Sequence, residues 1–196
     1  MHGVTPRTRA TGGRSRRVKA PAVLAAALLP VLAACPRGPE PAGPEVPVTD
    51  EPQRAATHGP FFPECGGVSD QEVMALTRVP GLVNTAKTSV GCQWLAGGSI
   101  VGPHFSFTWF RGSPIGRERK TEEYSRTSVE DITIEGHDGF IAIAEDPRMG
   151  VYLCEIGIQF DDDFIEWSVS YASPPLPADA CEVAKELTRQ SIVNAK

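Results

Sequence analysis

Two neighbouring stretches decide the fold: VYLCEIGIQF at residues 151–160 and FIEWSVSYA at residues 164–172. Their apolar side chains recur at every second position, namely Tyr152, Cys154, Ile156, Ile158 and Phe160 in the first and Ile165, Trp167, Val169 and Tyr171 in the second. A period of two predicts β-strands with one buried face. The connection, Asp161 to Asp163, is too short for a crossover, so the two strands should be antiparallel neighbours.

The same pattern extends toward the N-terminus. It predicts strands at residues 131–135 and 140–144, broken by the turn sequences 136–139 and 146–150, and earlier strands at 90–95 and 105–111. The charged residues 115–126 could form a helix, because opposite charges are spaced four residues apart there.

Helices are predicted at both ends of these strands. Ser69 to Glu72 forms a capping box, so a short helix should begin there and stop before Pro80. Asp179 to Glu182 repeats the pattern and should open a helix that runs to about Val193. We therefore expect an α+β fold, an antiparallel β-sheet meander packed against an N-terminal and a C-terminal helix, in a single domain over residues 60–196.

The N-terminal segment has the features of an export signal. Residues 1–19 are basic without an acid, residues 20–34 are apolar and too short to cross a bilayer, and Leu32-Ala33-Ala34-Cys35 follows. This tetrapeptide resembles the bacterial lipobox, which implies that residues 1–34 are a signal peptide and that Cys35 carries a diacylglycerol and a further acyl chain such as palmitate. The alternative is an ordinary secreted protein with a fortuitous cysteine.

After this cysteine, residues 35–59 are rich in proline and acids and should form a semi-extended tether. Loss of residues 1–34 removes six of the 19 basic residues and none of the 24 acidic ones, which leaves 13 against 24 and a net charge of −11. Such an acidic chain is an unsuitable partner for nucleic acid or anionic lipid surfaces.

Four cysteines remain after the anchor, and in an exported chain an even number predicts two disulfides. A zinc site is the competing interpretation, although the spacing contains no Cys-x-x-Cys pair. Cys92 and Cys154 should point to the core from strands, whereas Cys65 and Cys181 lie beside the two helices. We therefore predict Cys65 with Cys92 and Cys154 with Cys181, the pairing with the shorter loops.

Catalytic motifs are not found in the sequence, and we assign no catalytic residue, metal ligand or cofactor. His104 and His137 lie in turn-like contexts and are expected to be merely exposed, and Asp161 to Asp163 should form a solvated hairpin tip. Four aromatic residues could line a pocket but are more typical of a core: Phe105, Phe107, Trp109 and Trp167.

A family resemblance rests on several short motifs in this order: Cys65 before a helix, Gly91-Cys92-Gln93-Trp94, Gly136-His137, Cys154 in a late strand, and Asp179-Ala180-Cys181-Glu182. Together with the lipobox and the tether, these motifs resemble the actinobacterial lipoproteins of domain-of-unknown-function family 3558. The resemblance implies a cell-envelope lipoprotein without an assigned activity.

Three classes of function stay open. The first is a non-catalytic binding or interaction module, held through Cys35 to the extracytoplasmic face of the cell membrane, which captures an envelope protein or an apolar small molecule. The second is an accessory or scaffolding subunit of a membrane complex, and the third an envelope enzyme. The ligand-binding residues are unassigned at this stage. An apolar groove with polar groups would favour binding, whereas a perturbed carboxylate in a cleft would favour an enzyme.

Overall fold

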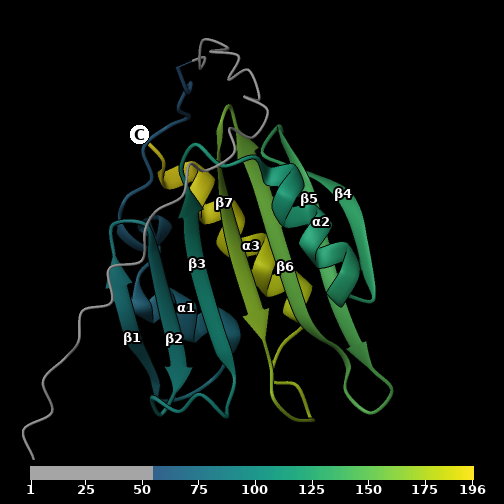
Figure 1. Ribbon diagram of the computed structural model, residues 1–196. Helices are drawn as coiled ribbons and strands as arrows, with labels where there is room; N and C mark the ends of the chain where they lie inside the picture. The colour runs from purple at the N-terminus through teal and green to yellow at the C-terminus, as the bar shows by residue number, and fades with distance from the viewer. Residues whose placement is uncertain (1–54) are drawn as a thin grey trace, which may run out of the picture. The chain divides into compact units, whose positions relative to one another are not determined.

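The computed structural model describes residues 55–196, which form a seven-stranded antiparallel sheet and three α-helices (Figure 1). The strands lie in the order β1-β2-β3-β7-β6-β5-β4. The elements are a 3₁₀ turn η1 (Glu64–Gly67), α1 (Asp70–Thr77), β1 (Leu82–Thr88), β2 (Gly91–Ala96), β3 (His104–Phe110), α2 (Ile115–Ser125), β4 (Ser128–Ile134), β5 (His137–Asp146), β6 (Gly150–Phe160), β7 (Asp163–Ser170) and α3 (Ala180–Asn194).

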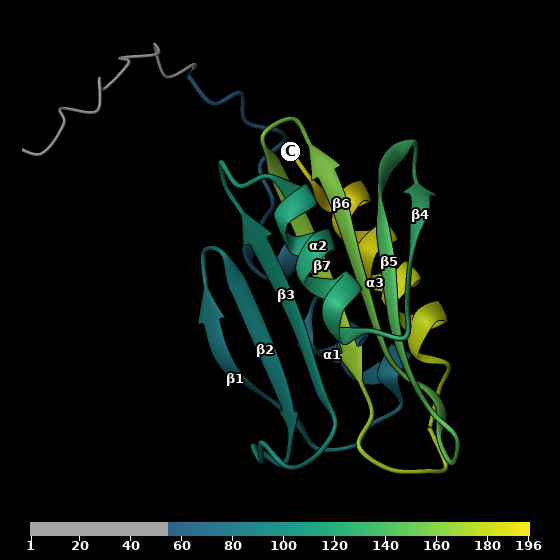
Figure 2. The ribbon, with the colours of Figure 1, turned by 45° about the vertical axis from the view of Figure 1, so that its right-hand side comes forward.

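The helices lie on both faces of the sheet. Figures 1 and 2 show α1 and α3 behind the strands and α2 in front of β5 and β6. The main core lies between the sheet and α3, where alternate residues of the central strands meet Val183, Ala184 and Leu187. The fold class is therefore α+β as expected, with helices at both ends of the strands.

Both predicted helix starts are confirmed. The Ser69 hydroxyl accepts a hydrogen bond from Glu72 N, the Glu72 carboxylate accepts one from Ser69 N, and Val68 and Val73 are buried in the core as in a hydrophobic staple. At α3 only half of the box forms. Asp179 caps Cys181 N and Glu182 N, whereas Glu182 turns to Lys185 instead.

The sheet differs from a simple meander in one connection. Strands β1 to β3 form one meander and β4 to β7 another, and the two are joined by the pairing of β3 with β7. The chain therefore crosses from β3 to the far edge of the sheet through α2 before it returns strand by strand. Strand β1 was not predicted, because its Asn84, Lys87 and repeated threonines obscure the alternation.

Both predicted disulfides are present, between Cys65 and Cys92 and between Cys154 and Cys181. Each joins a helical segment to a strand of the core face. Cys154 and Cys181 are thus the covalent link that holds the first turn of α3 against β6.

Candidate functional site

The main candidate site is a groove of about 550 Å³ between the edge strand β4 and α3. We call it the β4–α3 groove and define it by its lining residues: Ile132, Thr133, Ile134, Glu135, Glu182, Lys185, Glu186 and Arg189. Ile132 and Ile134 are half-buried and pack against the main core, so they form an apolar floor. The remaining side chains give the groove a polar and charged rim.

The local sequence explains why these residues meet. Glu135 and Gly136 have φ values of 49° and 80°, the left-handed conformations of a two-residue type I′ turn. This turn pairs Ile134 with His137 and fixes the register of β4, so that Ile132 and Ile134 point toward α3. The Cys154–Cys181 disulfide sets the position of α3 on the opposite side.

The rim of the groove consists of ion pairs along α3. Lys185 Nζ lies 2.9 Å from Glu182 Oε1, and Arg189 Nη2 lies 2.6 Å from Glu186 Oε1. The hydrogen bonds from Arg189 and Gln190 lower the pKa of the Glu186 carboxyl. The rim is therefore charged at neutral pH, with each base already matched to an acid.

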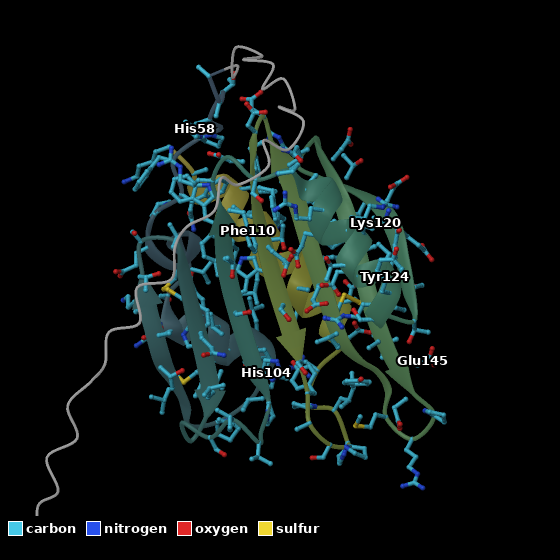
Figure 3. All side chains as sticks on the ribbon, in the orientation of Figure 1. His58, His104, Phe110, Lys120, Tyr124 and Glu145 are labelled. Carbon is cyan, nitrogen blue, oxygen red and sulfur yellow. A yellow bond between two sulfur atoms is a disulfide. The ribbon has the colours of Figure 1, made fainter. Side chains whose placement is uncertain are left out.

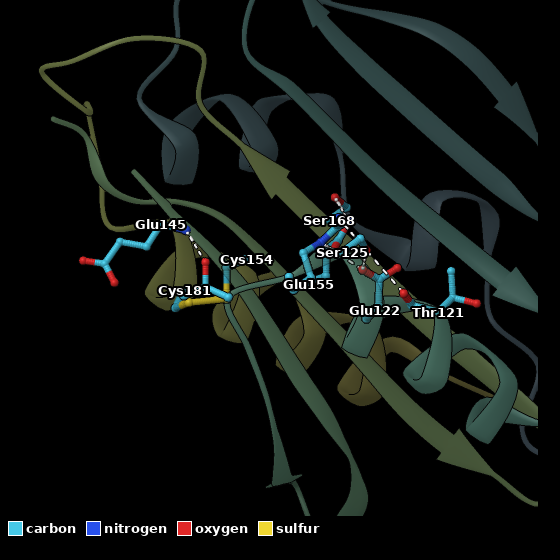
Figure 4. A network of polar contacts seen from close by, with 10 residues as sticks. Thr121, Glu122, Ser125, Glu145, Cys154, Glu155, Ser168 and Cys181 are labelled. Carbon is cyan, nitrogen blue, oxygen red and sulfur yellow. Dashed lines mark hydrogen bonds and ion pairs between the residues drawn. A yellow bond between two sulfur atoms is a disulfide. The ribbon is translucent and has the colours of Figure 1, made fainter. Parts of the chain in front are cut away.

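A second polar cluster lies beneath α2, on the other face of the sheet (Figure 4). Glu122 is the only buried residue of α2. Arg126 Nε lies 2.9 Å from Glu122 Oε2 and also contacts Glu155 of β6, whose other oxygen accepts a hydrogen bond from Ser168. Polar contacts thus hold α2 on the sheet where a helix would ordinarily bury apolar side chains.

Burial and mutual repulsion perturb the carboxyls of this cluster. Burial, followed by the charge of Glu155, raises the pKa of Glu122 to about 7. The same two causes, in the same order, raise the pKa of Glu166 to about 8. The Glu166 Oε2 atom is buried and accepts no hydrogen bond within the described residues, so no donor stabilises the ionised form of this carboxyl.

Perturbed carboxyls are candidates for acid–base chemistry only where substrate can reach them. The β4–α3 groove and three further surface pockets of residues 55–196 are lined by other residues. Among these same residues, no group of three or more His, Cys, Asp or Glu side chains is arranged to hold a metal ion. The contacts of Arg126 with Glu122 and Glu155 attach α2 to the sheet.

The predicted site residues are found in different places. Cys35, the signal peptide and most of the tether lie outside the described residues. The four aromatic residues Phe105, Phe107, Trp109 and Trp167 are buried in the main core, where Trp167 stacks on Trp94.

Both histidines were placed wrongly in turns. His137 is the first residue of β5, because the turn between β4 and β5 takes only two residues, and it is exposed as predicted. His104 is the first residue of β3 and is half-buried. Figure 3 shows His104 and His58 at opposite ends of β3, so these two do not form a common site.

The expected hairpin tip at residues 161–163 is also partly wrong. Asp163 is fully buried at the start of β7, where its carboxylate accepts hydrogen bonds from Gly112 N and contacts the His58 ring at 2.8 Å. Asp163 therefore attaches the segment around His58, at the start of the described residues, to the sheet. The three consecutive aspartates did not predict this burial, because it arises from contacts with Gly112 and His58, which lie 51 and 105 positions away in the sequence.

The sequence reasoning also missed Glu122, Glu155 and Glu166. Glu155 of β6 and Glu166 of β7 occupy strand positions that ordinarily face solvent, and Glu122 lies in a highly charged helix. Packing of α2 on the sheet buries Glu122 and Glu155, whereas Glu166 is half-buried with its Oε2 atom covered. The groove was missed for a similar reason, since it depends on β4 being an edge strand beside α3.

Comparison with known proteins places these features in a family. The sequence model described as "Protein of unknown function (DUF3558)" matches residues 30–194, which is most of the chain. The chain belongs to the DUF3558 family. The protein named "Putative lipoprotein LprB" of Mycobacterium tuberculosis (strain ATCC 25618 / H37Rv) is 66% identical to this chain over 172 residues, covering 87% of this chain and 91% of the relative. The protein of the same name from Mycobacterium leprae (strain TN) is 69% identical over 139 residues, covering 71% and 73%.

On the basis of this similarity to the mycobacterial proteins, the chain is a lipoprotein. No solved structure matches it. None of the helices within residues 55–196 is long and apolar enough to span a membrane.

Proposed function

We propose that this lipoprotein is anchored to the cell membrane through an acylated Cys35 and that its domain, on the extracytoplasmic face, is a non-catalytic module that binds a partner polypeptide. The observation that carries the proposal is the β4–α3 groove, in which an apolar floor of Ile132 and Ile134 lies beside a sheet edge and a charged rim. Residues 1–34 would serve as the signal peptide and the proline-rich segment as the tether.

The form of the groove favours a polypeptide over an apolar small molecule. Pockets for small ligands enclose most of the ligand surface within apolar walls. This groove instead runs along an edge strand, and ion-paired side chains of α3 form its outer wall. Such a lining suits a chain that offers both apolar side chains and backbone polar groups.

The carboxyl cluster beneath α2 supports a non-catalytic role. Arg126 and Ser168 engage Glu155, Arg126 also engages Glu122, and all these groups lie on the opposite face of the sheet from the groove. The groove itself is rimmed by acids that are matched to lysine and arginine. An exposed ion-paired rim suits recognition better than proton transfer.

Site-specific photo-cross-linking in intact membranes tests the proposal. A benzophenone amino acid at Lys185 places the probe on the groove rim. Loss of the ion pair with Glu182 should destabilise the domain little, because exposed ion pairs contribute little to stability. The matched control carries the probe at Tyr124, which is exposed on the outer side of α2 (Figure 3).

We expect a discrete polypeptide cross-link from Lys185 that is absent from Tyr124 and is lost when Ile132→Asn is added to the Lys185 probe. Equal cross-linking from both positions, or cross-linking from Lys185 to lipid alone, would contradict a polypeptide site in the groove. Thermal unfolding of each variant confirms that the domain is folded.

A further inference from the structure

The two edges of the sheet are built differently. At the β1 edge the pairing with β2 shifts register between Asn84 and Ala86, and the exposed Lys87 is paired with Glu64. Bulges and lysines are the usual means by which proteins block an edge strand. At the other edge, β4 pairs with β5 over Ser128–Ile134 without any shift. The regular edge is thus the one beside the groove.

The register also defines what β4 offers along its outer side. The two-residue turn makes Ile134 and His137 a hydrogen-bonded pair, and hydrogen-bonded and non-hydrogen-bonded pairs alternate along an antiparallel ladder. The N–H and C=O groups of Val129, Asp131 and Thr133 are therefore directed away from β5. Within residues 55–196 no strand lies beyond β4 to accept them.

The charge of this edge is acidic. Glu130 and Asp131 are exposed on β4, and Glu135 follows at the turn. Arg119 pairs with Asp131, and the bases of α3 are paired with its own acids, so Glu130 and Glu135 have no ion-pair partner within 4 Å in the described part of the chain. An occupant with basic side chains would complement these acids.

We propose that an extended, basic segment of a partner polypeptide binds along β4 as an eighth strand of the sheet, with apolar side chains over Ile132 and Ile134. The proposal rests on the proposed function, because it names the partner class of the β4–α3 groove. Backbone hydrogen bonds to Val129, Asp131 and Thr133 hold the segment. Its basic side chains lie on the face opposite Ile132 and Ile134, which carries Asp131, with Glu135 at the adjoining turn.

A second copy of the chain fits this edge poorly. Antiparallel pairing of β4 with itself about its middle residue would place Asp131 opposite Asp131 and the two Glu130 side chains nearby. Like charges directly opposite each other destabilise a strand pair. The acids that favour a basic strand therefore oppose self-association.

The experiment uses the full chain, purified from membranes in detergent, and a fluorescein-labelled decapeptide of alternating lysine and valine, with binding measured by fluorescence anisotropy. Glutamate in place of lysine should abolish binding. Two N-methylated versions of the peptide are compared, each methylated at every second backbone amide and offset from the other by one residue. The version that lacks the N–H donors facing β4 should bind about tenfold more weakly or worse, whereas the other version should bind as the unmodified peptide does.

The protein side of the test is Thr133→Pro, which removes an outward N–H without touching the pairing to β5. Thr133→Ala is the matched control, since both variants lose the hydroxyl that donates to Asp138. We expect about tenfold weaker peptide binding in Thr133→Pro alone. If Thr133→Pro fails to fold by circular dichroism, the two N-methylated peptides decide the matter.

Three outcomes overturn strand addition. The first is no binding of the lysine–valine peptide, and the second is binding that ignores both the N-methyl phase and Thr133→Pro. The third is a dimer of the full chain, seen by sedimentation, that Thr133→Pro dissolves. A cross-link from Lys185 that survives any of these results would keep the groove as a polypeptide site and discard only the added strand.

Discussion

Arg126, the residue that caps the C-terminus of α2, and Glu155 of β6 form a charged hydrogen bond of 2.5 Å between Nε and Oε2, across the interface of the helix and the sheet. Both side chains are largely buried, and Glu122 shares the same guanidinium. Because Glu122 is the only buried residue of α2, the contacts of Arg126 with Glu122 and Glu155 are the main attachment of the helix.

Replacement of Arg126 by alanine should therefore destabilise the protein strongly. It leaves the buried carboxylate of Glu155 without its counter-charge, and loss of one member of a buried pair costs about 3 kcal/mol or more. Arg119→Ala is the control, because Arg119 pairs with the exposed Asp131 and should change stability by less than about 1 kcal/mol. Urea denaturation measures both, and equal losses would contradict the role of Arg126.

The raised pKa values predict a pH dependence of stability. In the unfolded chain Glu122 and Glu166 titrate near the ordinary pKa of 4.5, whereas in the folded domain the values are about 7 and about 8. The folded state therefore holds more protons between these limits, and its stability falls as the pH rises from about 4.5 through about 8. The urea midpoint should be lower at pH 9 than at pH 6.

Glu166→Gln tests the origin of this effect, since a neutral amide cannot ionise in the buried site. The variant should lose less stability than the wild type between pH 6 and pH 9, whereas Glu145→Gln, at an exposed residue of β5, should behave as the wild type does. An unchanged pH dependence in Glu166→Gln would mean that other groups cause it.

The two disulfides should stabilise the domain by similar amounts. Each closes a separation of 27 residues, and the chain-entropy treatment gives about 3.5 kcal/mol for a loop of this size. Removal of either pair by double substitution with alanine should lower the free energy of unfolding accordingly. A pair whose removal costs nothing would show that its loop is already restricted in the unfolded chain.

Cys35→Ser should release the protein from the membrane, because it removes the thiol that the lipid anchor requires. Cell fractionation with a salt wash measures this, and cross-linking competence of the released protein at Lys185 shows that the domain is unaffected. A Cys35→Ser protein that still sediments with membranes would place the membrane contact on the domain itself.

Local signals in the sequence determined the individual elements. The capping box at Ser69, the N-cap at Asp179 and the two-residue period of residues 151–172 act within a few positions, so they are readable without the fold. The disulfide pairing was predicted as well. The assignment of each cysteine to a helix or to a strand disfavoured only the pairing of Cys92 with Cys154, and the shorter loops selected between the two pairings that remained.

Tertiary structure alone decided how these elements combine. The pairing of β3 with β7 joins residues about 60 positions apart, and it leaves β4 as an edge beside α3. The burial of Glu122 and Glu155 follows from the same arrangement, because α2 must cross the sheet to connect β3 with β4. Such contacts depend on the free energy of the whole packed domain, and an alternating pattern that tells inside from outside carries no record of which helix covers the outer face.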